Sequence, residues 1–176
     1  LWFVGDLLVY RSLQERMGLR RCKTPVSGAA PIARELLERF YGIGVPIFEG
    51  YGQTECGGVS HVNSPNKATL GSVGQVLPGV EFKTAKDGEI LVRSPSVFVG
   101  YLHDEKATAE TVDEDGWLHT GDLGTMDSRG VIRITGRIKD MIIRGGENLF
   151  PTEIENALLE HSSVAEVAVV GLPDLK

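Results

Sequence analysis

The chain has 176 residues, of which 41% are hydrophobic and 24% charged, a composition typical of a folded globular protein and not of a disordered one. Its formal net charge of −6 and its pI near 5.2 argue against nucleic acid or an anionic membrane surface as a partner. No apolar run approaches the roughly 20 residues that a membrane-spanning helix needs.

The cysteines and the ends of the chain bear on its compartment and its completeness. Only Cys22 and Cys56 are present, too few for a disulfide scaffold, and a reducing compartment is the default for such a chain. The first residues lack the basic leader of a signal peptide, so we expect a cytoplasmic location. The uncapped apolar start at residues 1–9 and the strand-like run at residues 165–170, which would need sheet partners further along, indicate a piece of a longer protein.

The first third of the chain alternates helical and strand patterns. Four elements are predicted in order: a helix over 5–17 that ends at Gly18, a strand over 22–26, a helix over 32–40 with Pro31 in its first turn, and a strand over 45–50. Such alternation favours parallel strands with ligands at their carboxyl ends. The loop Ser27–Ala30 and the segment after residue 50 both lie at such ends, where we expect a ligand pocket.

The pattern changes between residues 70 and 137, where short β-runs are separated by turn pairs. Strands are predicted over 73–76, 80–83, 89–93 and 131–135, with one helix over 104–111 capped by Asp104. A further helix is predicted to begin at Pro151, with acidic residues in its first turns. The fold class is therefore α/β, followed by an antiparallel β-barrel-like subdomain and then the start of a small α+β domain.

The segment Tyr51–Glu55, of sequence Tyr-Gly-Gln-Thr-Glu, is the most informative in the chain. It follows an apolar strand bounded by glycines and presents an aromatic ring, a hydroxyl and a carboxylate. The ring of Tyr51 can stack on a base, the hydroxyl of Thr54 can donate to a phosphate, and the carboxylate of Glu55 can bind Mg²⁺. Taken alone, the segment is equally compatible with an ordinary turn after a buried strand.

Three further segments carry groups that suit a nucleotide, and each is also compatible with a simpler structure. Asp122 follows Thr-Gly at the exit of a predicted turn, where its carboxylate can accept hydrogen bonds from two ribose hydroxyls or cap an Asx turn. Arg137 and Lys139 belong to a charged cluster of the kind that is usually solvated. Gly145 and Gly146 allow the backbone to approach a ligand closely, or simply form a turn.

Together, in this order and at these separations, the four segments resemble the adenylate-forming superfamily, which includes acyl-CoA synthetases, luciferases and peptide-synthetase adenylation domains. The resemblance covers essentially the whole chain. It implies that residues 1–138 form the C-terminal part of a large AMP-binding domain, and that residues 139–176 form the hinge and the beginning of a small C-terminal domain. An upstream phosphate-binding loop and a downstream lysine of this family find no match, so the chain alone is expected to be inactive.

The resemblance also assigns a role to each predicted site residue. On the adenosine side, Gly28, Ala29 and Ala30 would line the base, Tyr51 would stack on it, and Asp122 and Arg137 would hold the ribose. Gly52, next to Tyr51, also belongs to the nucleotide-binding residues. Near the phosphates, Thr54 would contact the α-phosphate and Glu55 would bind Mg²⁺. In the small domain, Lys139 would be the hinge and Gly145 and Gly146 would line the pantetheine tunnel.

The chemistry that this family implies has two steps and uses a small-molecule carboxylic acid, ATP and coenzyme A. The acid is first activated as an acyl-adenylate, and the thiol of CoA then displaces AMP. Residues 96–101 look most like fatty-acyl-CoA synthetases, whereas residues 145–151 look more like the medium-chain and aryl-acid branches, so the acyl substrate stays open, as does the oligomeric state.

Three other functions compete with this assignment. An adenylation domain that loads a carrier protein instead of CoA is the runner-up, and a catalytically dead nucleotide-binding fragment is the alternative from another class. A Rossmann dehydrogenase is disfavoured because Glu55 stands where its third glycine would be.

Overall fold

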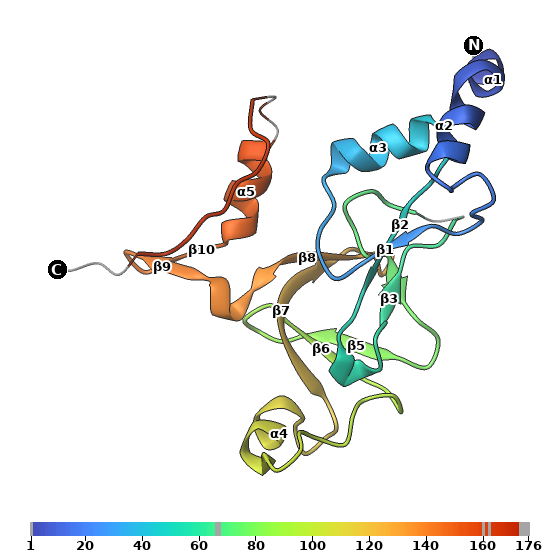
Figure 1. The fold of residues 1–176 in the computed structure, drawn as a ribbon. Coiled ribbons are helices and arrows are strands. Elements are labelled where there is room, and N and C mark those ends of the chain that lie inside the picture. Colours follow the sequence, from blue (N-terminus) through green and yellow to red (C-terminus); the bar gives the residue numbers. More distant parts are fainter. Residues whose placement is uncertain (1, 66–67, 160, 162, 173–176) are drawn as a thin grey trace.

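The computed structural model describes residues 2–65, 68–159, 161 and 163–172 (Figure 1). Two four-stranded sheets, with strand orders β1-β2-β3-β4 and β5-β6-β7-β8, make up the body of the molecule, and β9 and β10 form a separate two-stranded hairpin. Figure 1 shows this hairpin and the last helix, α5, standing away from the body beyond the end of β8. No helix among the described residues is long and apolar enough to cross a membrane.

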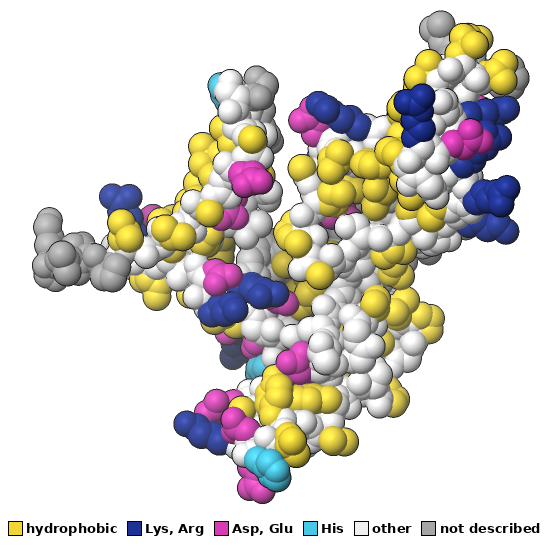
Figure 2. Space-filling model, in the orientation of Figure 1, with side chains coloured by type: hydrophobic (Ala, Val, Ile, Leu, Met, Phe, Trp, Pro, Cys, Tyr) yellow, Lys and Arg dark blue, Asp and Glu magenta, His cyan; other side chains and the backbone are white. Residues whose placement is uncertain are grey.

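The predicted first helix is confirmed as a nearly continuous run made of α1 (Trp2–Gly5), the π-helical segment η1 (Asp6–Tyr10) and α2 (Arg11–Arg16). Gly18 follows it with a φ of +71°, a conformation that glycine adopts without strain. The apolar side chains that predicted this helix face solvent in the described structure, with Leu7 57% and Leu8 71% exposed. Figure 2 shows these hydrophobic groups at the surface of the N-terminal helices.

The first sheet contains the parallel pair that the sequence predicted. β1 (Val26–Ser27) and β2 (Phe48–Tyr51) run parallel, and β3 (His61–Val62) and β4 (Gln75–Val76) continue the sheet in antiparallel register. α3 (Arg34–Gly42) connects the parallel strands. Because β1 and β2 are parallel, the Ser27–Ala30 loop and the Tyr51 segment leave the sheet at the same edge.

Two boundaries in this region were predicted wrongly. The strand expected over 22–26 shrinks to Val26–Ser27, because the Cys22 N–H closes a turn on the Leu19 carbonyl at 3.0 Å. Pro31 lies before α3 and not in its first turn, since Ala33 is still extended with a ψ of 132°. The helix then begins at Arg34, where its i,i+4 ion pairs start.

The second sheet is the antiparallel subdomain. It consists of β5 (Glu81–Thr84), β6 (Glu89–Arg93), β7 (Leu118–Met126) and β8 (Ile132–Arg137). Its inward side chains Ile90, Val92, Leu118 and Ile132 form the main core together with Cys56, which lies outside this sheet. The predicted helix is confirmed as α4 (Glu105–Thr111), whose cap Asp104 accepts a hydrogen bond from the Ala107 N–H at 2.9 Å.

Gly74 joins the two sheets. It forms an isolated bridge with Ile132 of β8 immediately before β4 begins. The Ile132 N–H donates to the Gly74 carbonyl at 2.9 Å, and the Val73 N–H donates to the Ile132 carbonyl at 3.0 Å. The short β4 therefore belongs to the first sheet while the residues before it are hydrogen-bonded to the second, which fixes the two sheets relative to each other.

The last part of the chain comprises the 3₁₀ helix η3 (Ile138–Asp140), β9 (Ile142–Arg144), β10 (Glu147–Leu149) and α5 (Pro151–Leu159). The start of α5 at Pro151 confirms the prediction. The strand expected over 165–170 is wrong, since these residues are not part of any described strand. There the Val169 N–H donates to Glu155 Oε1 at 2.9 Å instead of entering a ladder.

Candidate functional site

A buried carboxylate where the two sheets meet is the centre of the candidate site. Asp122, in β7, is 6% exposed, and its Oδ2 accepts a hydrogen bond from the Tyr51 hydroxyl at 2.8 Å. Its Oδ1 lies 3.0 Å from Nε of Arg137, its direct cross-strand partner in β8. The structure thus brings together three predicted site residues from β2, β7 and β8.

The local backbone of Asp122 differs from the expectation. It does not sit at the exit of a turn or in an Asx turn, but inside the nine-residue strand β7. The sequence does not reveal this strand because Gly121, which takes a φ of +71° within it, interrupts the alternation of apolar and polar residues. β7 also contains extra residues opposite β6, where Glu89 pairs with Leu123 but Leu91 pairs with His119, so β7 bends beside the carboxylate.

The Tyr51 side chain is held on two sides. Burial raises the pKa of Tyr51 well above its usual range, so the hydroxyl stays protonated and donates to Asp122. The ring lies against the imidazole of His61, with centroids 5.7 Å apart. Burial also lowers the pKa of His61 to about 4, which keeps this imidazole neutral at physiological pH. The expected stacking of Tyr51 on a base stays a prediction.

A second buried carboxylate, which the sequence analysis did not identify, stabilises the backbone next to Asp122. Glu89, at the start of β6, accepts the Gly121 N–H on Oε1 at 2.9 Å, and its Oε2 lies 2.8 Å from Nδ1 of His119. The hydroxyl of Thr120 donates to the Ile90 carbonyl at 2.8 Å. These bonds fix the backbone on both sides of Gly121, immediately before Asp122. The sequence signal that could have revealed Glu89 is an acidic residue immediately before the apolar run Ile90–Val92.

A pocket of about 430 Å³ opens beside Asp122, within the range of small-molecule sites. Its lining includes the predicted residues Asp122, Arg137 and Lys139 together with Gln53, Thr120, Gly121 and Ile138. The amide nitrogen of Gln53 is buried there without a hydrogen-bond partner among the described residues.

The Ser27–Ala30 loop adjoins this region through backbone contacts. A Cβ on Gly28 would lie 3.1 Å from the Gly50 carbonyl oxygen, and Ala29 has an unusual φ of +70°. Gly52 is more tightly constrained than Gly28, since a Cβ there would lie only 2.3 Å from the Gly58 carbonyl oxygen. Gly28, Ala29 and Ala30 are not among the residues that line the 430 Å³ pocket, so their contact with a base stays a prediction.

Thr54 and Glu55 lie on the 3₁₀ helix η2 (Thr54–Cys56), which follows β2. The Oε1 atom of Glu55 accepts a hydrogen bond from the Tyr101 hydroxyl at 2.8 Å. No group of three or more metal-ligating side chains occurs in the described part of the chain. A single carboxylate still fits Mg²⁺, because this ion is commonly held by one or two carboxylates and by substrate phosphates.

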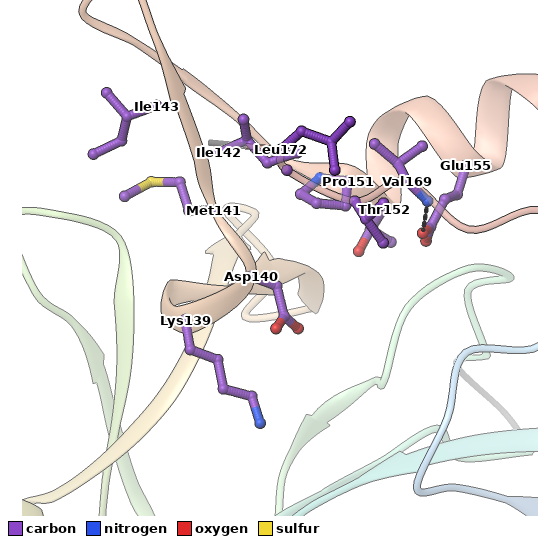
Figure 3. A pocket seen from close by; sticks show the side chains of 12 residues that line it. Lys139, Asp140, Met141, Ile142, Ile143, Pro151, Thr152, Glu155, Val169 and Leu172 are labelled. Atoms are coloured by element: carbon purple, nitrogen blue, oxygen red, sulfur yellow. Dashed lines mark hydrogen bonds between the residues drawn. The ribbon is translucent and has the colours of Figure 1, made fainter. Parts of the chain in front are cut away.

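The other predicted residues lie beyond β8. Lys139 belongs to η3 and also borders a second hollow of about 580 Å³ between η3, β9, α5 and residues 169–172. Figure 3 shows the side chains of Lys139 and Asp140 pointing away from the apolar side chains of β9. Gly145 and Gly146, with φ of +61° and +87°, form the two-residue turn between β9 and β10. The structure therefore shows the glycine pair as a hairpin turn, apart from the Asp122 pocket.

The chain is similar in sequence to a known enzyme family and to individual CoA ligases. The sequence model of the AMP-binding enzyme family matches residues 6–102. A long-chain-fatty-acid–CoA ligase of Mycobacterium bovis is 42% identical over 169 residues, which cover 96% of this chain and 28% of that protein. A 3-[(3aS,4S,7aS)-7a-methyl-1,5-dioxo-octahydro-1H-inden-4-yl]propanoyl:CoA ligase of Rhodococcus jostii is 44% identical over 160 residues, covering 89% of this chain and 31% of that protein. The chain thus spans less than a third of the length of these relatives.

Solved structures agree with the sequence comparisons. The o-succinylbenzoate CoA synthetase of Bacillus subtilis in complex with its acyl-adenylate intermediate superposes with a TM-score of 0.80 at 37% identity, covering 94% of this chain and 37% of that one. The same synthetase in complex with ATP and a magnesium ion gives a TM-score of 0.80 at 36% identity, covering 94% of this chain and 38% of that one.

Proposed function

Since the chain belongs to the AMP-binding enzyme family, we propose that it supplies the adenosine-binding part of an ATP-dependent acid–thiol ligase that joins a fatty acid to coenzyme A. The observation that carries the proposal is the buried Asp122 carboxylate, held by Tyr51 and Arg137 at the wall of a pocket. Its Oδ2 already accepts one hydrogen bond and its Oδ1 is paired with the Arg137 guanidinium, and each oxygen retains a lone pair for another donor. It can therefore accept bonds from two adjacent ribose hydroxyls without losing its own partners.

For the other predicted residues we propose the roles that the family resemblance implies. Tyr51 and the Gly28–Ala30 loop bound the base, Arg137 stands beside the sugar, and Thr54 donates to the α-phosphate. Glu55 would hold Mg²⁺, which neutralises phosphate charge when bound. A substrate carboxylate attacks the α-phosphorus, pyrophosphate leaves, and the CoA thiol then attacks the acyl carbon and releases AMP. No protein nucleophile is required.

The proposed acid substrate and the proposed thiol acceptor are supported by different observations. The relatives are named as CoA ligases, which supports CoA over a carrier protein as the acceptor. Their named acids include a long-chain fatty acid and a fused-ring propanoate at similar identity, so a fatty acid is the proposed substrate and a ring acid is the competing outcome in a substrate screen. We also propose residues 1–138 as part of the large domain and residues 139–176 as the hinge and the start of the small one.

The binding part of the proposal is tested directly on the 176-residue chain. We expect AMP to bind with a dissociation constant on the order of 1 mM, because one ribose and one phosphate enter an open site. Isothermal titration calorimetry measures the affinity. AMP lacking both ribose hydroxyls is the matched ligand, and we expect it to bind several-fold more weakly. Absence of AMP binding to a folded chain at several millimolar ligand would contradict the pocket assignment.

The two half-reactions are tested in the protein produced from its complete coding sequence. Lys139→Pro should retain adenylate formation but lower thioester formation about tenfold or more, because proline fixes φ at a residue that must rotate as a hinge. The 3₁₀ conformation of η3 already suits proline, so the orientation described here stays accessible. Pyrophosphate release and acyl-CoA production are measured separately.

Gly146→Leu should show the same split by obstructing the pantetheine path. Gly146→Asn is its control, because asparagine tolerates a positive φ and is smaller. Equal loss of both activities in Gly146→Leu would contradict the tunnel role, and undiminished acyl-CoA output in Lys139→Pro would contradict the hinge.

A further inference from the structure

The segment between β6 and α4 is anchored to the short helix that carries Glu55. The Phe98 N–H donates to the Glu55 carbonyl at 2.8 Å, and the Ser96 hydroxyl donates to the Cys56 carbonyl at 2.9 Å. Gly57 leaves little space between the two segments, since a Cβ there would lie 3.0 Å from the Ser96 side chain. The two backbones are thus held together on the side of η2 that bears Glu55.

Tyr101 extends this contact to the carboxylate itself. Its hydroxyl donates to Oε1 of Glu55 at 2.8 Å, and its ring packs edge-to-face on Phe98 with centroids 4.8 Å apart. A phenol hydroxyl is protonated at neutral pH, so Tyr101 is the donor in this contact and Glu55 the acceptor. Among the described residues, Oε1 of Glu55 accepts this hydrogen bond, and Oε2 is the oxygen that can bind a ligand.

The backbone of Tyr101 is fixed in turn by α4. The Tyr101 N–H donates to the Thr108 hydroxyl at 2.9 Å, and that hydroxyl donates to the carbonyl of the helix cap Asp104 at 2.8 Å. Gly100 makes the approach possible, because a Cβ there would lie 2.7 Å from the Thr108 side chain. A continuous chain of contacts therefore runs from α4 through Tyr101 to Glu55.

We propose that Tyr101 is a positioning residue that orients the Glu55 carboxylate so that Oε2 meets the metal ion of bound metal–ATP. The inference rests on the proposed role of Glu55 as the Mg²⁺ ligand. Mg²⁺ demands near-ideal octahedral geometry, and partners of ligating carboxylates tune such sites. A carboxylate whose other oxygen is held in place loses less orientational freedom on binding.

The proposed positioning role can be tested separately from any effect on stability. Tyr101 is 40% exposed, so water can replace its hydroxyl at Glu55 and at Thr111, and the loss of the hydroxyl should change stability little. The packing on Phe98 uses the ring alone, which phenylalanine reproduces. Tyr101→Phe should therefore change how Mg²⁺ couples to ATP while leaving the fold and the adenosine contacts unchanged.

The experiment measures this coupling on the 176-residue chain by calorimetry. The dissociation constant of ATP is determined in EDTA and again in excess Mg²⁺. The value in EDTA divided by the value in Mg²⁺ is the ratio that gives the effect of the metal. We expect Mg²⁺ to tighten ATP binding in the wild type. In Tyr101→Phe the ratio should fall about tenfold, which is the low end of the effect of residues that hydrogen-bond to metal ligands. The AMP affinity in EDTA and the melting temperature should stay unchanged. Tyr41→Phe on α3 is the matched control and should leave the ratio intact.

Two further variants separate this inference from the proposed function. Glu55→Ala should lower the ratio, and adding Tyr101→Phe to it should have no further effect. Thr108→Val, which removes the anchor of the Tyr101 backbone, should lower the ratio less than Tyr101→Phe does. An unchanged ratio in Tyr101→Phe, with a reduced one in Glu55→Ala, would overturn the role of Tyr101 alone. An unchanged ratio in Glu55→Ala would overturn both roles.

Discussion

Asp122→Ala is expected to weaken the binding of an acyl-adenylate analogue to the chain by about 10- to 100-fold, the loss that corresponds to hydrogen bonds accepted by a charged group. The substitution removes the acceptor proposed for the ribose. It also leaves the Tyr51 hydroxyl without its partner and frees the Arg137 guanidinium. Titration calorimetry measures the change.

Two controls make this result specific. Asp115→Ala removes an exposed acid from a turn and should leave binding unchanged. Asp122→Asn keeps the size of the side chain and one acceptor oxygen, so it should lose less affinity than Asp122→Ala while the fold is retained. Wild-type affinity in a folded Asp122→Ala variant would show that the pocket beside β7 is not the adenosine site.

Gly74→Ala is expected to lower the free energy of unfolding by about 4 kcal/mol, among the larger effects of single substitutions. A Cβ at Gly74 would lie 2.3 Å from the Val62 carbonyl oxygen, and the residue has a φ of +79°, so both space and backbone conformation oppose it. Because Gly74 bonds to Ile132, relief of the clash would pull the two sheets apart. Urea unfolding followed by circular dichroism measures the change.

Gly79→Ala is the matched control for this substitution. Gly79 has a similar φ of +82° but nothing within 4 Å of a Cβ, so alanine there meets only the backbone strain, about 1 to 2 kcal/mol. The difference between the two variants isolates the steric contribution at the junction of the sheets. Similar losses in both would contradict the close approach at Gly74.

Local patterns in the sequence predicted most of the framework, because they report short-range physics. The antiparallel strand at Glu89–Arg93, the Asp104-capped helix and the parallel pairing of the first two strands follow from periodicity, capping and alternation. These features depend on residues close together in the chain. The grouping of Tyr51, Asp122 and Arg137 was also anticipated, but from the family resemblance and not from the spacing.

The features of the fold and the site that were not predicted depend on contacts between residues far apart in the sequence. β7 was missed because Gly121 breaks its alternation, and its strand conformation is set by pairing with β6 and β8. The support of Gly121 by Glu89 joins residues far apart in sequence, as does the bond between Tyr101 and Glu55. The strand-like run at 165–170 illustrates the converse, since β-propensity without a neighbouring strand in the described structure does not produce a ladder.

The direct pairing of Asp122 with Arg137 across β7 and β8 has a consequence for insertions and deletions. Side chains alternate between the faces of a strand, so deletion of one residue from β7 between this pair and the turn would put the two groups on opposite faces. The exposed turn between the strands, at residues 127–130, is free of this constraint. Length differences among related chains should therefore occur in that turn, while the spacing from Asp122 to Met126 is kept.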